Sequence, residues 1–370
     1  MERAYQICTR CIMDITDPEI TFDENGACNH CTEYYERRPQ LVPEGEAQKA
    51  RLNELVAEMK EKGKGKDYDC IIGISGGVDS SYMAYKVKEL GIRALAVHFD
   101  NGWNSELAVK NIENIVKKLG FDYQTYVVDW EEFKDVQLAF FRASIANIEA
   151  PSDHAFLAAI FQLCNKYGIK YVLTGSNYNT EGILPKSWGY SARDLTPIKA
   201  IHKQFGTMPM KTYPRLGYGA EIYYNMIKRI KFVRLLHYIP YVKAEAMDVL
   251  ENKLDWQYYG GKHYESVFTR FFQGYILPKK FKIDKRRAHL STLICNNDFS
   301  REEALEEMKK ETYPPEMLKQ DKEYVFKKWG LTKEEFQEIM DKPIKSYRDY
   351  PNQEKFFKLL YSVYSKIRKI

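Results

Sequence analysis

A short glycine-rich segment, SGGVDS at residues 75–80, has the residue types needed to hold a phosphate group. Two adjacent glycines allow the backbone to turn with successive N–H groups directed inward. Residues 70–74 are apolar and a helix-favouring stretch follows the loop, so a helix N-terminus would add free N–H groups and a positive dipole end. Asp79 beside phosphates suits a Mg²⁺ ligand, because without a metal ion its charge would repel the nucleotide. The residues assigned to ATP or pyrophosphate are Ser75, Gly76, Gly77, Asp79 and Ser80.

The alternative for this segment is a tight strand-to-helix turn without a ligand, and the context around it favours the phosphate site. A Walker-type loop is not supported, since residues 63–66 lack the required Ser or Thr and the preceding strand. The whole pattern resembles the PP-loop, or N-type, ATP pyrophosphatases, the family of asparagine, GMP and NAD synthetases. That resemblance implies cleavage of ATP to AMP and pyrophosphate, and it places His98, Phe99 and Asp100 near the nucleotide.

Two C-x-x-C pairs occupy the N-terminal segment, with 16 residues between the second and third cysteines. This spacing is typical of a four-cysteine zinc site, although an iron–sulfur cluster uses the same ligands. A polar segment of this length buries too little apolar surface to fold alone, so a metal ion would supply folding free energy. A closed site of this kind is structural. The predicted metal ligands are Cys8, Cys11, Cys28 and Cys31, while Cys70, Cys164 and Cys295 are expected to be core residues.

The stretch TGSNYNTEG at 174–182 leaves a predicted strand at the carboxyl edge of the sheet, where ligands bind in open α/β folds. Glu181 could act as a general base or cap a helix, and the location favours catalysis. Trp188 could stack on a sugar or base, or belong to the core. Gly175 is assigned to the ATP site, and the residues assigned to substrate binding here are Asn177, Asn179, Thr180 and Trp188.

A second unusual stretch is basic: GGKHYES at 260–266 is followed by DKRRAH at 284–289. Lysine and arginine here could hold the pyrophosphate or a substrate diphosphate, or they could form a solvated charged face. We assign substrate binding to Lys262 and Arg286, and a catalytic role to Lys285 together with Asp79 and Glu181.

Four motifs together resemble the N-acetyl sugar amidotransferases of lipopolysaccharide and nonulosonic acid biosynthesis. They are CTRCIMDITDP with FDENGACNHC, SGGVDSSY, TGSNYNTEGILPKSWGY, and the stretch from GGKHYES to DKRRAHLS. The resemblance implies that ATP adenylates the acetamido oxygen of a nucleotide-linked sugar and that ammonia then displaces AMP to give an acetamidino group. Mg²⁺ and structural zinc are the implied metals.

Ammonia is expected to come from a separate protein. Glutamine hydrolysis needs an activated cysteine at a processed N-terminus or on a nucleophile elbow, and neither pattern is visible. The resembling family implies a glutaminase like that of histidine biosynthesis, acting with a cyclase-like subunit that could form an ammonia channel.

Hydrophobic periodicity predicts an α/β fold with a doubly wound, mostly parallel sheet. The expected strands are 70–74, 94–99, 122–128 and 170–174, and the expected helices are 80–90, 105–119 and 153–167. After about residue 205 the alternation ends, and helices are expected within 220–250, 301–311 and 332–341. The expected domains are a zinc knob (1–40), a connecting helix (41–66), a PP-loop domain (67–205) and a helical extension (206–370).

The composition, with 44% hydrophobic residues, is typical of a soluble globular protein. No run long enough for a membrane span and no secretory signal are readable, so a cytoplasmic location is expected. A net charge of +5 neither requires nor excludes RNA, but the composition is weak for RNA binding, so no nucleic acid partner is expected. A PP-loop enzyme that inserts sulfur into tRNA remains the first alternative, and a non-catalytic zinc-knob scaffold remains the second. The basic tail at 355–370 could touch an anionic membrane surface, although docking on the protein's own core is favoured.

Overall fold

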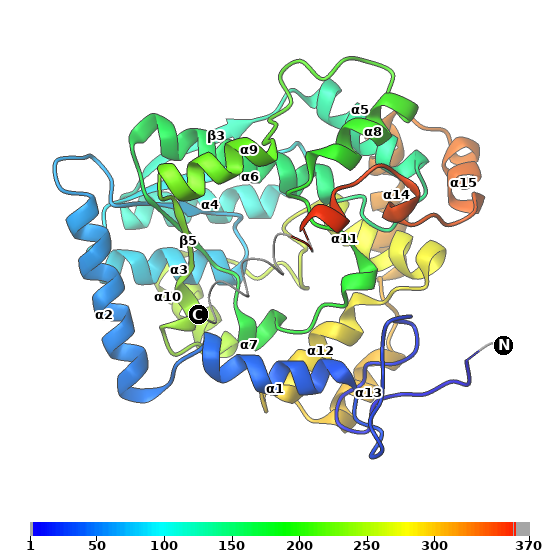
Figure 1. Ribbon diagram of the computed structural model, residues 1–370, viewed down its shortest axis with the longest axis horizontal. Coiled ribbons are helices and arrows are strands. Elements are labelled where there is room, and N and C mark those ends of the chain that lie inside the picture. Colours follow the sequence, from blue (N-terminus) through cyan, green and yellow to red (C-terminus); the bar gives the residue numbers. More distant parts are fainter. Residues whose placement is uncertain (1–2, 358, 360–370) are drawn as a thin grey trace.

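The computed structural model describes residues 3–357 and 359 (Figure 1). Its sheet has five parallel strands in the order β3-β2-β1-β4-β5. Its strands are β1 (Cys70–Gly73), β2 (Ala94–Asp100), β3 (Asp122–Val127), β4 (Tyr171–Thr174) and β5 (Lys231–Arg234). The strand order reverses at β1, because β2 and β3 extend to one side and β4 and β5 to the other. Ligands bind at such a switch point, outside the carboxyl ends of the strands.

Alternate side chains of the strands pack against helices on both faces of the sheet, which confirms the doubly wound fold. Ile72 and Leu173 lie in a core shared with Met83 of α3, whereas Ile71 and Val172 lie in a core shared with Phe161 of α6. The first face is covered by α2 (Gly45–Lys62), α3 (Val78–Glu89), α4 (Glu106–Leu119) and α10 (Lys243–Leu254), and the second by α6 (Ala150–Tyr167).

One element differs from the sequence expectation. Residues 220–250, expected to be helical, contain strand β5, which pairs with β4 at the sheet edge. Its four residues are too few to show a clear period of two, and aromatic and basic residues surround them. Phe232 packs against Phe161 of α6, so burial of one face selects the strand. Helix α5 (Trp130–Arg142) was also not anticipated.

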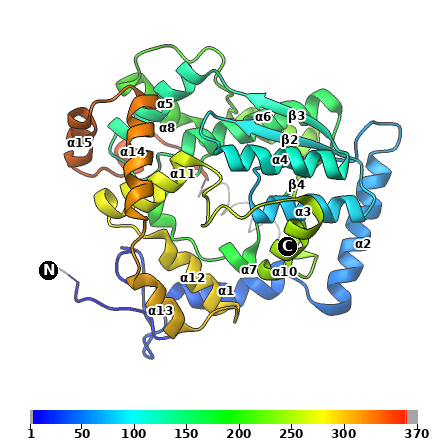
Figure 2. The ribbon, with the colours of Figure 1, turned by 180° about the vertical axis from the view of Figure 1, so that it is seen from behind.

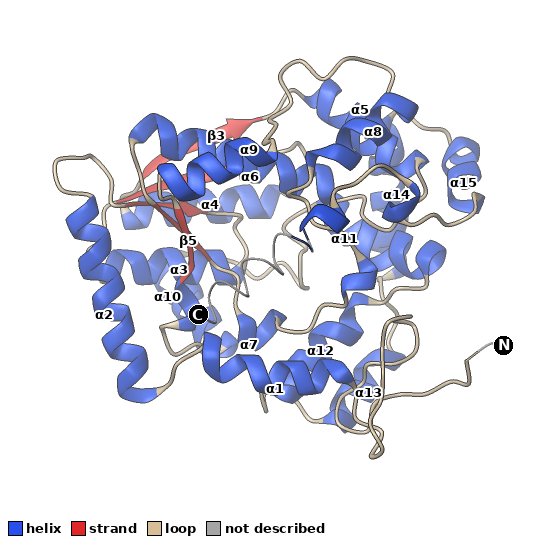
Figure 3. Ribbon diagram, viewed as in Figure 1, coloured by secondary structure: helices blue, strands red, loops and turns tan. Residues whose placement is uncertain are grey.

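The remaining helices, apart from α9, form a second body beside the sheet (Figures 2 and 3). In the described residues beyond β5 the regular structure is helical, as expected for the extension. The helices of the second body are α1 (Asn29–Leu41), α7 (Tyr178–Glu181), α8 (Leu195–Phe205), α11 (Val267–Phe271), α12 (Lys285–Cys295), α13 (Arg301–Lys309), α14 (Pro315–Trp329) and α15 (Lys333–Asp341). Helix α9 (Tyr218–Ile222) lies over α6 instead (Figure 1), and Tyr224 in the segment that follows it stacks on Phe161 of α6. Short 3₁₀ or π segments lie at Lys186–Trp188, Tyr223–Ile227, Leu235–His237, Phe272–Phe281 and Tyr347–Asp349. The core of the second body is aromatic, and the Trp329 ring contacts the rings of both Trp103 and Phe141.

Among the described residues, no helix combines the length and apolarity that crossing a bilayer requires. Most of the basic tail considered for membrane contact, residues 358 and 360–370, lies outside the described residues.

Candidate active site

The phosphate loop, residues 74–80, leaves β1 and includes the first three residues of α3, as the sequence predicts. Gly76 has φ +80°, and a Cβ there would lie 2.6 Å from the carbonyl oxygen of Ala108, so both the conformation and the space require glycine. The hydroxyl oxygens of Ser75 and Ser80 lie 3.1 Å apart, and the Gly77 N–H donates to Ser75 Oγ over 3.3 Å. The loop thus places two hydroxyls and a helix N-terminus around one small space.

Gly175, directly after β4, closes this space from the neighbouring strand. A Cβ at this position would lie 2.8 Å from the Ser80 backbone nitrogen and 3.0 Å from the Asp79 carbonyl oxygen. Only glycine lets the β4 chain approach the start of α3 so closely. The two predicted stretches therefore meet at the switch point of the sheet.

A cavity of about 250 Å³ opens beside the loop. Five chain segments supply its walls: the loop after β1, the segment after β4, the start of α10, the loop at 259–265 and helix α12. The residues that line it are Ser75, Gly77, Val78, Asp79, Ser80, Gly175, Ser176, Thr180, Glu181, Lys243, Tyr259, Gly261, Lys262, His263, Glu265 and His289. Glu181 and the nucleotide loop share one cavity, as the general-base hypothesis requires.

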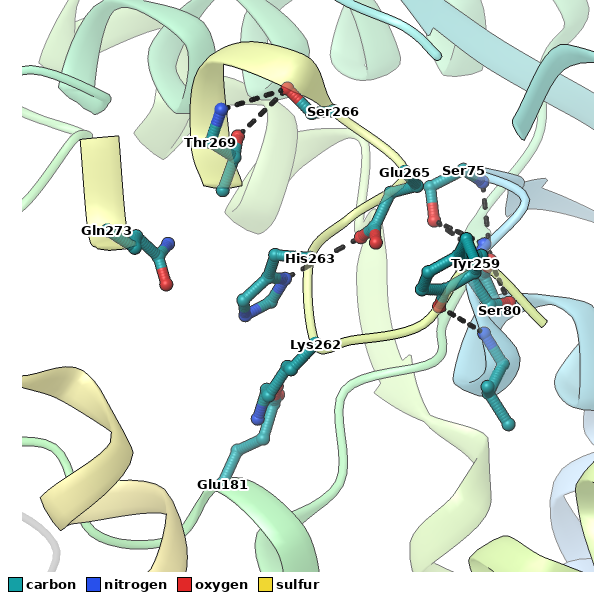
Figure 4. A network of polar contacts seen from close by, with 12 residues as sticks. Ser75, Ser80, Glu181, Tyr259, Lys262, His263, Glu265, Ser266, Thr269 and Gln273 are labelled. Atoms are coloured by element: carbon teal, nitrogen blue, oxygen red, sulfur yellow. Dashed lines mark hydrogen bonds and ion pairs between the residues drawn. The ribbon is translucent and has the colours of Figure 1, made fainter. Parts of the chain in front are cut away.

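Glu181 and Lys262 point toward one another across the cavity (Figure 4), with 3.0 Å between Oε1 and Nζ. Burial would raise the pKa of Glu181, but the Lys262 cation and the nearby His263 outweigh it and lower that pKa. Lys262 Nζ is also 3.2 Å from His289 Nδ1, and burial followed by the Lys262 charge lowers the pKa of His289 to about 3. The imidazole is therefore neutral near pH 7, while Glu181 is ionised.

Asp79 is held by a residue that follows β5. The Tyr241 hydroxyl donates a hydrogen bond to Asp79 Oδ1, and burial raises the pKa of this carboxyl. Lys243, at the start of α10, lines the same cavity, and burial lowers the pKa of its ammonium group. Because burial removes part of the water around this ammonium group, its charge is stabilised when a phosphate anion binds beside it.

The residues expected at the end of β2 do not line the cavity but stabilise the strand end. Asn104 Nδ2 donates to His98 Nε2 over 2.9 Å, so His98 Nδ1–H donates to the Ile74 carbonyl oxygen over 3.0 Å. Asp100 accepts hydrogen bonds from Asn104 and from the Gly102 N–H. Phe99 packs against aromatic rings. Their assignment to the nucleotide stays a prediction.

The predicted substrate residues after β4 separate into two groups. Thr180 lines the cavity, and its buried hydroxyl lacks a hydrogen-bond partner within the described chain. Asn177 instead caps α7 by accepting from the Asn179 N–H, and Asn179 accepts from Arg38. Trp188 is 5% exposed and lies in the core of the second body, so its placement agrees with the alternative that it is a core residue.

The two basic residues at the start of α12 also lie outside the cavity. Arg286 binds Asp284 at 2.7 Å and donates to the Lys310 carbonyl oxygen at 3.0 Å, so its guanidinium caps the end of α13. Lys285 Nζ lies 4.0 Å from Glu149 Oε2. Burial, followed by the charge of Glu149, raises the pKa of nearby Asp153 to about 7. Neither placement supports the substrate role of Arg286 or the catalytic role of Lys285, which stay predictions.

The four knob cysteines converge on one point and are fully buried. Their Sγ atoms lie within 4.8 Å of one another, with contacts of 3.7 to 3.8 Å. Sulfurs around one tetrahedral zinc, with Zn–S of about 2.3 Å, lie about 3.8 Å apart. Backbone N–H groups of Cys11 and Cys28 also donate to Cys8 Sγ, which favours the thiolate. The group could hold a single zinc ion, and the spacing is too small for a multi-iron cluster between the sulfurs.

Comparison with protein families divides the chain into two parts. Residues 49–213 match the NAD synthase family, and residues 265–368 match the family described as LPS biosynthesis protein WbpG-like, C-terminal domain. The chain thus combines a part that is similar to NAD synthase with a part that is similar to the C-terminal domain of WbpG-like LPS biosynthesis proteins. These matches agree with the family resemblance that the sequence motifs indicate.

Curated relatives of this chain match it only in part. The tRNA(Ile)-lysidine synthase of Chlamydia pneumoniae is 29% identical over 133 residues, which are 35% of this chain and 39% of that protein. The tRNA-specific 2-thiouridylase MnmA 2 of Fusobacterium nucleatum is 29% identical over 120 residues, 30% of this chain and 34% of that protein. The match thus spans less than two fifths of either relative.

Solved structures are similar at low identity. The NMN synthetase of Francisella tularensis matches with a TM-score of 0.30 and 14% identity, covering 56% of this chain and 87% of that one. The NH3-dependent NAD synthetase of Campylobacter jejuni matches with a TM-score of 0.29 and 14% identity, covering 55% and 84%.

Proposed function

We propose that this protein is an AMP-forming amidotransferase that converts the acetamido group of a nucleotide-linked sugar into an acetamidino group. The observation that carries the proposal is the shared cavity, in which the phosphate loop faces an ionised Glu181 paired with Lys262. A PP-loop domain supplies ATP-dependent activation, and the WbpG-like domain supports a substrate of lipopolysaccharide biosynthesis.

The reaction has two steps. The amide oxygen of the sugar attacks the α-phosphorus of ATP, and the bond to the β-phosphate oxygen breaks, releasing pyrophosphate. Ammonia then adds to the imidate carbon and loses protons, and AMP leaves with the former amide oxygen. Activation is needed because an amide oxygen is otherwise a very poor leaving group.

Residues on one wall of the cavity bind the phosphates, and residues on the opposite wall act in the ammonia step. The N–H groups and hydroxyls of residues 75–80 bind pyrophosphate, and Lys243 adds a cation beside them. Asp79, whose Oδ1 accepts a hydrogen bond from Tyr241, would hold Mg²⁺, which would supply charge neutralisation for the phosphates. Glu181 accepts a proton from the attacking nitrogen, and the adjacent Lys262 keeps it ionised beforehand.

The ammonia in this scheme comes from a separate glutaminase and cyclase-like subunit. Of the seven cysteines, four form the knob and the other three are 0 to 3% exposed, so none is an accessible nucleophile. Zinc in the knob completes the set of proposed cofactors.

The test is to incubate the protein with ATP, an ammonium salt and a panel of nucleotide-linked diacetamido sugars, following AMP and the mass of the sugar product. A sugar-dependent release of AMP with a product about 1 Da lighter, the difference between O and NH, is expected. Glu181→Gln should retain pyrophosphate release but slow the ammonia step. AMP release that no sugar stimulates would contradict the proposal.

The positions of the seven cysteines also disfavour the first alternative, an enzyme that inserts sulfur into tRNA. The partial relatives act on tRNA, and insertion of sulfur would need a reactive cysteine beside the phosphate loop. None of the seven cysteines lines the cavity. A non-catalytic scaffold is disfavoured because Ser75, Asp79 and Ser80 all face the cavity.

A further inference from the structure

Helix α12 connects the cysteine knob to the cavity. His289, in its second turn, lines the cavity, whereas Cys295 at its end places Sγ 3.7 Å from Cys31 Sγ. Six residues of α-helix span about 9 Å. In both ribbon views α12 lies beside α1, and α13 lies next to the knob (Figures 1 and 2). One rigid element therefore touches both sites.

On the knob side, two arginines and a serine bind backbone groups between the cysteines. Arg287 Nη1 donates to the Ile12 carbonyl oxygen over 2.6 Å, and Ser291 Oγ accepts from the Ile12 N–H over 3.2 Å. Arg301, in the first turn of α13, donates to the carbonyl oxygens of Cys8 and Cys11, each at 3.0 Å. These carbonyl groups point toward the arginines only while the first C-x-x-C turn is folded.

On the cavity side, α12 and α1 hold helix α7, which carries Thr180 and Glu181. Thr292 Oγ1 accepts from the Ile183 N–H over 3.0 Å, and His289 Nδ1 lies 3.0 Å from the Thr180 carbonyl oxygen. A third link runs through α1, which begins within the second C-x-x-C pair. Its Tyr34 ring stacks on Tyr178 with centroids 5.2 Å apart.

The nucleotide wall has different supports. Trp256 Nε1 donates to the Gly76 carbonyl oxygen over 2.8 Å, and the Val78 N–H donates to Tyr259 over 3.2 Å. In the described part of the chain, no hydrogen bond joins residues 74–80 to the knob. The phosphate loop therefore has hydrogen-bonded supports that do not pass through the knob.

We propose that the metal-bound knob positions the sugar-binding wall of the cavity, through Arg287 and Arg301 as positioning residues, and leaves ATP binding independent. The assignment of this wall to the sugar rests on the proposed function. Without metal, four buried thiols and an irregular segment lose what holds them together, so the carbonyl partners of both arginines are lost. Helix α12 then loses these contacts to the knob and holds α7 less firmly, while the hydrogen bonds of the nucleotide loop remain.

The experiment compares Arg301→Met and Arg287→Met with Arg51→Met, a control on α2 whose arginine is 49% exposed and pairs with Glu54. Metal per chain, the Kd for ATP, the KM for the sugar and hydrogen exchange are measured for each. We expect ATP affinity within twofold of wild type, a sugar KM raised at least tenfold, and faster exchange confined to α7, α12 and the knob. Arg301→Lys should recover part of the sugar KM.

Chelation of the wild-type metal forms the second arm and should give the same pattern, with ATP binding retained and exchange in α7 and α12 increased. An unchanged sugar KM and unchanged exchange in both arginine variants would overturn the proposal. Equal loss of ATP and sugar binding would overturn it too. If the wild type shows no sugar-dependent AMP release, the proposed function fails, while exchange and ATP binding still decide whether the knob anchors this wall.

Discussion

Replacing Gly175 by alanine should weaken both the fold and ATP binding. The new Cβ would lie 2.8 Å from the Ser80 nitrogen and 2.9 Å from the Asp79 carbonyl carbon, and both neighbours are backbone atoms. A contact of 3.4 Å is the lower end of ordinary van der Waals distances, so β4 and α3 must separate by about 0.6 Å. Overpacking of this kind costs about 1 to 3 kcal/mol.

The same displacement moves the Ser80 N–H away from the phosphate position, so the KM for ATP should rise at least fivefold. Urea unfolding gives the free energy, and pyrophosphate release at varied ATP gives the KM. Gly219→Ala is the matched control, because its Cβ would meet nothing within 4 Å and the residue lies within helix α9. Alanine there should leave ATP kinetics unchanged and stability equal or slightly higher. A Gly175→Ala protein with wild-type stability and ATP KM would refute the close-approach argument.

Three further outcomes follow from the site. Asp79→Asn should abolish AMP formation with an unchanged circular dichroism spectrum, because it removes the proposed Mg²⁺ ligand and keeps the shape of the loop; near-normal turnover would be inconsistent with this role. Cys8→Ser and Cys28→Ser should lower metal content and melting temperature, since each opens the knob site; elemental analysis checks this, and iron without zinc would show the metal assignment to be wrong. Between about pH 6.5 and about pH 3 the unfolded chain binds a proton at His289 that the folded chain does not. The free energy of unfolding therefore decreases as the pH is lowered through this window. His289→Gln should reduce that slope in urea titrations, and an identical slope would contradict the buried neutral imidazole.

Much of the fold could be predicted because its signals are local. The loop at 75–80 needs only a strand, two glycines and a helix start in succession, and the C-x-x-C pairs carry their own spacing. Each of these features is specified within about thirty residues of sequence. The carboxyl-edge rule for parallel sheets then brings Gly175 and Glu181 to the loop without further information.

The rest of the site depends on packing between distant segments. Tyr241 contacts Asp79 across a separation of 162 residues, and no motif marks it or Lys243. Helix α12 shows the same limit, since Arg286 has the chemistry of a phosphate ligand, yet its guanidinium turns to Asp284 while His289 reaches the cavity. Which side of a helix faces a ligand is set by tertiary contacts.

The hydrogen bond between Ile12 and Ser291 spans 279 residues and has a consequence for biosynthesis. At about 5 to 20 residues per second, a ribosome needs roughly 14 to 56 s to add the residues between them. The knob cysteines are made before α12 and could bind a metal ion during that interval. The surface around Ile12 stays uncovered meanwhile, so a metal ion bound at this stage would fix the shape of the knob before α12 can pack on it.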